Sequence, residues 1–105
     1  MRLTLWSAVE NINIDKGTIP IKFTAKSTLL TSLGAQRDKT GWTIAQMRER
    51  IKVLDILHEA KDDSEIELTK EQLMFLSESL NNTQFVFALD NTLILADKIT
   101  ELINS

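Results

Sequence analysis

The sequence holds 105 residues, of which 43% are hydrophobic and 26% are charged, with a formal net charge of −3 at pH 7. This composition is typical of a single globular domain, here residues 1–105, and it excludes the disordered and fibrous classes. Because cysteine is absent, disulfides, thiolate nucleophiles and cysteine-ligated zinc are excluded as well.

The N-terminal residues predict β structure. Residues 3–14 alternate between apolar and polar side chains, as a strand with one buried face does. The apolar residues change face between Val9 and Ile12, which predicts a bulge or a break at that point.

A hairpin is expected next. Residues 15–17 predict a three-residue turn that ends in glycine, and they join strands at residues 9–14 and 18–24. Pro20 places the second strand at a sheet edge, because proline has no N–H to donate. Residues 25–33 then predict a short helix that ends at Gly34.

The strongest helix signal covers residues 43–60. Thr43 and Gln46 have the spacing of a capping box, in which each side chain bonds the backbone N–H of the other residue. Apolar side chains then recur every three or four residues, which predicts a wide stripe buried in the core. Its members are Ile44, Met47, Ile51, Leu54 and Leu57, and Val53, Ile56 and Ala60 widen it; Met47, Ile51 and Leu54 are expected to be buried. We expect this helix to be central, with the other elements packed around it.

The C-terminal half repeats the same start signal at Thr69 and Gln72, which predicts a helix to about Leu80 after a short strand at residues 65–68. Residues 84–88 fit either a strand or one helical turn. Asp90 is expected to cap a last helix that buries five apolar side chains, namely Leu93, Ala96, Ile99, Leu102 and Ile103. The fold class predicted is α+β, with an N-terminal hairpin or small antiparallel sheet packed on three or four helices.

Motifs for chemistry are absent from the sequence. It holds no phosphate-binding loop, no dinucleotide-binding glycine pattern, no nucleophile elbow and no zinc-binding helix motif. His58, the single histidine, lies at helical spacing from Asp55 and Asp62, which would suit a general base or a metal ligand. A solvated histidine near a helix C-terminus explains the same spacing more simply. We therefore predict no enzyme activity, no catalytic residue, no cofactor and no metal.

Charge is distributed unevenly along the chain. Residues 1–52 carry a net charge of +5 and residues 53–105 a net charge of −8. The two halves either neutralise each other in the folded chain, or they serve self-association, docking on a charged protein, or nucleic-acid contact through the basic half. The candidate interaction surface consists of basic side chains, namely Lys22, Lys26, Arg37, Lys39, Arg48 and Lys52.

Residues 47–80 resemble small uncharacterised proteins encoded by tailed phages and prophages. The resemblance lies in the layout: the helix with Arg48-Glu49-Arg50-Ile51-Lys52-Val53-Leu54-Asp55, an acidic turn, the step Glu67-Leu68-Thr69 and a short helix. It implies a phage accessory or virion-associated protein without catalysis, and it transfers no functional residue.

The expected function is a non-catalytic protein–protein interaction module of phage type, which self-associates or docks on a protein partner. The alternative is a nucleic-acid-binding regulator that uses the basic N-terminal half. No secretory signal and no apolar run long enough for a bilayer are present in the sequence, so we expect no membrane partner and a cytoplasmic location, with the virion as the alternative for a phage protein.

Overall fold

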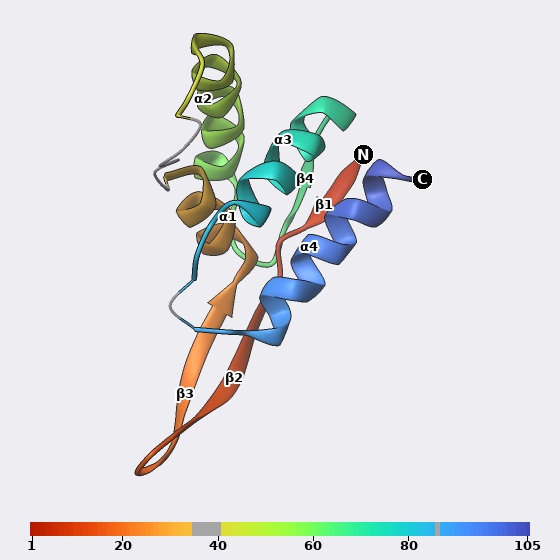
Figure 1. The fold of residues 1–105 in the computed structure, drawn as a ribbon. Coiled ribbons are helices and arrows are strands. Elements are labelled where there is room, and N and C mark those ends of the chain that lie inside the picture. Colours follow the sequence, from red (N-terminus) through yellow and green to blue (C-terminus); the bar gives the residue numbers. More distant parts are fainter. Residues whose placement is uncertain (35–40, 86) are drawn as a thin grey trace.

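The computed structural model describes residues 1–34, 41–85 and 87–105. Within them the chain forms two antiparallel two-stranded sheets and four helices, which confirms the α+β class (Figure 1). The order is β1 (Arg2–Thr4), β2 (Ser7–Ile14), β3 (Gly17–Thr24), α1 (Ala25–Gly34), α2 (Ile44–Glu59), β4 (Glu65–Glu67), α3 (Lys70–Asn81) and α4 (Asp90–Ile103).

Strands β1 and β4 pair across 60 residues of chain. Leu3 lies opposite Ile66, and both are buried. The short strand predicted at residues 65–68 is therefore confirmed, with Glu65–Glu67 as its extent. Each helix in the described residues is too short or too polar to span a bilayer.

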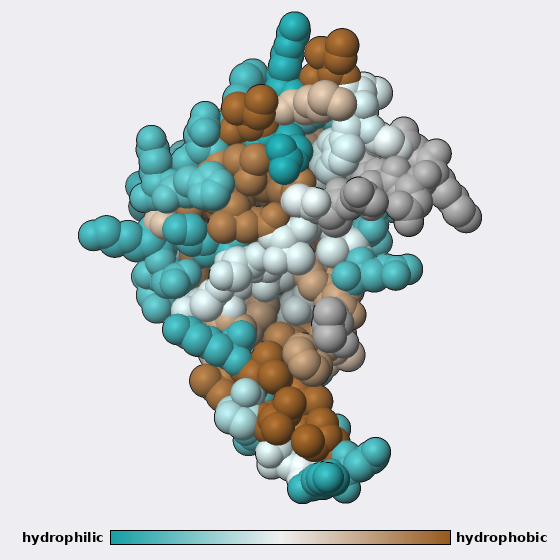
Figure 2. Space-filling model, turned by 90° about the vertical axis from the view of Figure 1, so that its left-hand side faces the viewer, coloured by the Kyte–Doolittle hydropathy of each residue, from teal (hydrophilic) through white to brown (hydrophobic). Residues whose placement is uncertain are grey.

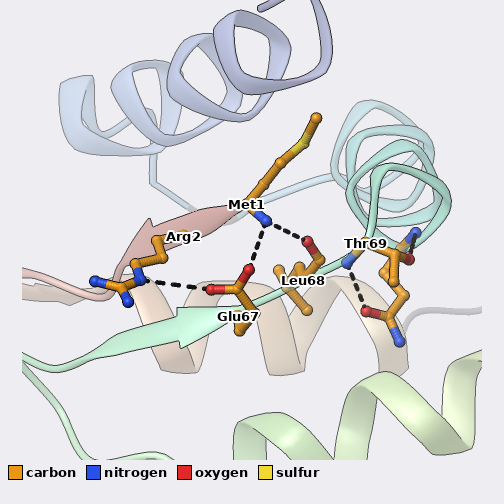
Figure 3. A network of polar contacts seen from close by, with 6 residues as sticks. Met1, Arg2, Glu67, Leu68 and Thr69 are labelled. Atoms are coloured by element: carbon orange, nitrogen blue, oxygen red, sulfur yellow. Dashed lines mark hydrogen bonds and ion pairs between the residues drawn. The ribbon is translucent and has the colours of Figure 1, made fainter.

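A network of polar contacts joins the start of β1 to the end of β4 (Figure 3). The Met1 amine donates to Glu67 Oε1 at 2.8 Å and to the Leu68 carbonyl oxygen at 3.0 Å, and Arg2 Nε lies 3.5 Å from Glu67 Oε2. The amine and the guanidinium together hold the pKa of Glu67 below its ordinary value. Thr69, directly after this contact, is the N-cap of α3.

The hairpin forms as predicted, but its details differ. Ile14 pairs with Gly17, so the turn holds two residues and not three, and β2 begins at Ser7. Gly17 has φ of 131°, a conformation that favours glycine. The break expected between Val9 and Ile12 is wrong: β2 is continuous there, and the irregular residues between the first two strands are 5 and 6.

Both capping boxes are confirmed. Thr43 Oγ1 accepts from Gln46 N at 3.1 Å while Gln46 Oε1 accepts from Thr43 N at 2.9 Å, and Thr69 and Gln72 repeat both bonds at α3. The helix predicted at residues 25–33 is α1, and Gly34 is its last residue. Local signals therefore located these three helices.

The burial expected along α2 is confirmed for Val53 and Leu57 but wrong for Met47 and Ile51. Met47 is 47% exposed, Ile51 is 55% exposed and Leu54 is half-buried, because the opposite side of the helix, with Val53 and Leu57, faces the core. Figure 1 shows α2 standing at one end of the molecule. The helix that contributes most to the core is α3, which buries Leu73, Phe75, Leu76, Ser79 and Leu80.

Helix α4 also departs from the sequence expectation. Leu95 and Ile99 are buried, but Leu93 is 67% exposed. Before α4, residues 84, 85, 87 and 88 are in neither a strand nor a helix, and Val86 lies outside the described residues. The chain therefore enters α4 from irregular backbone, and its first turn needs hydrogen-bond acceptors from elsewhere.

Glu10 of β2, and not Asp90, supplies those acceptors. Its carboxylate accepts from the backbone N–H groups of Asp90 and Asn91, each at 2.8 Å, and from the Asn91 side chain at 2.7 Å. Asp90 is the first helical residue and Leu89 holds the cap position. The two N–H groups of α4 and the Asn91 amide hold the pKa of Glu10 below its ordinary value.

This contact predicts a pH dependence. A lowered folded-state pKa contributes stability above the ordinary pKa near 4.5, and the contribution is lost as the pH falls through the lowered value. Glu10→Gln should therefore destabilise the protein at pH 7 and reduce the further loss on acidification to pH 3. Urea titrations at both pH values measure this, with Glu101→Gln, an exposed glutamate of α4, as the control. An identical loss for Glu10→Gln and wild type between the two pH values would contradict the role of Glu10.

Candidate functional site

The basic candidate residues fall on separate elements. Lys22 is exposed on β3, and Arg48 and Lys52 are exposed on α2. Lys26 of α1 is used inside the fold, because its Nζ donates to the Ala60 carbonyl oxygen at 2.7 Å and so satisfies the end of α2. The other two candidates, Arg37 and Lys39, lie outside the described residues. The structure therefore brings Arg48 and Lys52 together on one helix and assigns Lys26 a role in packing.

Acidic and histidine side chains form no metal site in the described residues. His58 is exposed on the last turn of α2. In the acidic turn, the Asp63 carboxylate accepts from the backbone N–H of Ser7 at 3.1 Å and from its hydroxyl at 3.4 Å. Asp63 thus fastens the turn to the start of β2, and this is a structural role.

The hairpin carries a face of isoleucines. Residues opposite each other in an antiparallel pair lie on one face, so the pairs Glu10–Ile21, Ile12–Ile19 and Ile14–Gly17 share a side. We call Ile12, Ile14, Ile19 and Ile21 the isoleucine face. Ile14 is exposed, the other three are half-buried, and all four lie outside the hydrophobic core cluster and the residues packed against it.

The base of the same hairpin face belongs to the core. Phe23 is buried, and its ring centroid lies 5.4 Å from that of Trp6. Trp6 in turn donates from Nε1 to Asn91 Oδ1 at 2.9 Å, and Lys98 Nζ lies 4.9 Å from its ring centroid. These contacts make Trp6 a packing residue that joins the hairpin to α4.

The hairpin extends beyond the helices (Figure 1). Its apolar face continues past Phe23, because the isoleucine face lies outside the core cluster. In Figure 2 hydrophobic residues gather at the lower end of the molecule, where the hairpin lies. A two-stranded hairpin is marginally stable in water unless another element covers one face. The isoleucine face is therefore suited to contact with another molecule.

A second apolar surface lies on the side of α2 that points away from the core. We call Ile44, Met47 and Ile51 the outer face of α2, and all three are exposed. Hydrophobic residues also gather at the upper end of the view in Figure 2, where α2 stands. Val53 and Leu57 cover the side of the helix that faces the core. Helix α2 is therefore apolar on two sides, one buried and one exposed.

An open groove of about 750 Å³ runs along α3 between α2 and α4. Its apolar lining includes Met74, Phe75 and Ile103, and its carboxylates are Glu49, Glu71 and Glu78. These glutamates would repel an anionic ligand.

Comparisons with protein-family models, curated proteins and solved structures found no match for this chain. Its function is therefore inferred from its own residues.

The sequence signals for both apolar surfaces were present but led to another interpretation. The alternation of residues 9–14 and 18–24 identifies the isoleucine face, and the spacing of Ile44, Met47 and Ile51 identifies the outer face of α2. Both patterns predict an apolar face, and neither says whether the chain itself or another molecule covers it. The sequence instead predicted an interaction surface of basic side chains, because charge is distributed unevenly along the chain.

Proposed function

We propose that this chain is a non-catalytic protein–protein interaction module that binds through the isoleucine face and the outer face of α2. The observation that carries the proposal is the isoleucine face, which lies on a hairpin that extends past the helices and outside the core cluster. Monomeric proteins rarely leave contiguous apolar patches uncovered, and such patches mark interaction sites.

The non-catalytic part of the proposal draws support from the titratable groups. The two carboxylates whose pKa is lowered in the described part of the chain, Glu10 and Glu67, both bond backbone or N-terminal groups. A shifted pKa often marks a catalytic group, but here each shift follows from a bond that holds the fold together.

A phage-type accessory or assembly role, with a cytoplasmic or virion location, completes the proposal. It rests on the sequence resemblance of residues 47–80. A small binding module whose partner is either itself or another protein is compatible with that role.

Light scattering coupled to size-exclusion chromatography tests the proposal at low and high salt. Association through apolar faces should persist at high salt, because screening weakens charge contacts and not the burial of aliphatic groups. The double variant Ile12→Ser with Ile19→Ser should reduce association while circular dichroism shows an unchanged fold. Val9→Ser is the matched control, since Val9 is 66% exposed on the other face of the same hairpin.

One outcome would contradict the proposal. If wild type and the double variant are both monomeric up to about 1 mM, and the double variant loses as much stability as a core substitution, the isoleucine face belongs to the fold of the monomer. A wild type that stays monomeric while the double variant keeps its stability would instead direct the search to an external protein partner.

The structure gives nucleic-acid binding less support. Lys26 is bonded to Ala60, Arg50 Nε donates to the Leu33 carbonyl oxygen at 2.6 Å, and Arg2 faces Glu67, so part of the basic half is used internally. We expect no binding to duplex or single-stranded DNA tighter than about 10 µM at physiological salt. Tighter, steeply salt-dependent binding in fluorescence anisotropy, abolished by Arg48→Ala with Lys52→Ala, would reverse this ranking.

A further inference from the structure

The outer face of α2 has the spacing of a coiled-coil seam. Ile44, Met47, Ile51 and Leu54 follow one another at intervals of three, four and three residues, which is the spacing of the a and d positions of a heptad. Three of these side chains are exposed, and Leu54 is half-buried at the margin of the core. A helix with this seam is shaped to pack against another helix.

Charged residues along one border of this seam change sign near its C-terminal end, between Lys52 and Asp55. Helical geometry places Arg48, Lys52, Asp55 and Glu59 on the same side of the stripe, and all four are exposed. The two near the N-terminus are basic and the two near the C-terminus are acidic. The contact between Lys52 and Glu49, at 3.9 Å, is an exposed ion pair of little strength and leaves Lys52 available.

We infer that the outer face of α2 binds the same face of a second copy of this chain, with the two α2 helices antiparallel across a two-fold axis. A two-fold interface must be self-complementary, because the same patch lies on both sides. Antiparallel pairing brings the basic half of each border against the acidic half of the other. Parallel pairing would put the two borders on opposite sides of the pair, so the four charges of one copy would not meet those of the other.

The inference rests on the proposed function and names the partner for one of its two surfaces. Helix α2 has 16 residues and so is about 24 Å long, which allows a few apolar layers in the contact. We therefore expect a reversible dimer, visible as a mass that rises from 11.9 kDa towards twice that value as the concentration is raised from about 10 µM to about 1 mM.

Charge reversal tests the pairing directly. Arg48→Glu with Lys52→Glu makes the border acidic, and Asp55→Lys with Glu59→Lys makes it basic, so each double variant alone should dimerise at least tenfold more weakly than wild type. An equimolar mixture should recover association as a heterodimer. Combining all four changes in one chain should restore the homodimer, because the pattern is then reversed but still self-complementary. Sedimentation equilibrium at low salt measures all four proteins.

Introduced cysteines test the orientation, since the described chain has no cysteine of its own. In an antiparallel pair Ile51 lies near the two-fold axis, whereas the two copies of Ile44 lie roughly 20 Å or more apart. Ile51→Cys should therefore form a disulfide-linked dimer under mild oxidation, and Ile44→Cys should form little. Val9→Cys, on the exposed hairpin, controls for chance collisions.

The outcomes separate this inference from the proposed function. Cross-linking of Ile44→Cys as strong as that of Ile51→Cys would show a parallel pair, and reversed-charge variants that dimerise as well as wild type would show that α2 is not the contact; either result overturns the inference. A wild type that remains monomeric at 1 mM overturns it too. The proposed function fails by a different result: wild type and the Ile12→Ser, Ile19→Ser protein are both monomeric, and the latter also loses as much stability as a core substitution.

Discussion

Phe23→Ala is expected to lower the free energy of unfolding by about 3–5 kcal/mol. Phe23 is 2% exposed at the base of the hairpin, and its ring packs against Trp6. Truncation removes this contact and leaves a cavity between the hairpin and the helices. Because Phe23 fastens β3 to the core, the hairpin should also lose protection in hydrogen exchange more than α3 does. A urea titration followed by circular dichroism measures the free energy.

The control for Phe23 comes from the same hairpin. Val9→Ala changes an aliphatic side chain that is 66% exposed, so its effect should stay within about 0.5 kcal/mol. If Phe23→Ala costs less than about 1 kcal/mol, the ring does not anchor the hairpin. The description of Phe23 as the point where this hairpin face joins the core would then be wrong.

Helix starts could be predicted from the sequence because the determining contacts are local. In both capping boxes the partner residues are three apart, and the hydrogen bonds form within the first turn. The signal at Thr43 and Thr69 therefore does not depend on what the rest of the chain does. Strand alternation predicted the hairpin for the same reason.

Contacts between distant residues could not be predicted in this way. Asp90 has the residue type of a helix cap, but the acceptor for the first turn of α4 is Glu10, 80 residues earlier. A carboxylate on a neighbouring strand can satisfy those N–H groups as well as a side chain of the helix itself. The use of Lys26 by the end of α2 depends on the same kind of distant approach.

The orientation of α2 was the main expectation that failed. Its apolar residues form one wide stripe that includes Met47 and Ile51 as well as Val53 and Leu57, and periodicity predicted burial of the whole stripe. The structure buries only Val53 and Leu57, because α1 and α3 approach α2 from that side. The face with Met47 and Ile51, which was wrongly expected to be buried, is also the one that we propose as an interface. A seam for a partner and a seam for the core have the same pattern when read along a single chain.

A paired substitution compares the two helices. Leu76 of α3 is fully buried, so Leu76→Ala should cost about 2–5 kcal/mol through lost burial and a cavity. Ile51→Ala should cost less than about 1 kcal/mol in the monomer, because Ile51 already faces solvent there. Dilute protein, below the range in which the proposed dimer forms, is needed for this measurement, since association would add the stability of the interface to that of the fold. At high concentration the cost of Ile51→Ala should rise while that of Leu76→Ala stays the same. A cost for Ile51→Ala near that of Leu76→Ala at every concentration would show that the outer face of α2 is part of the core, and it would remove the basis for the α2 interface.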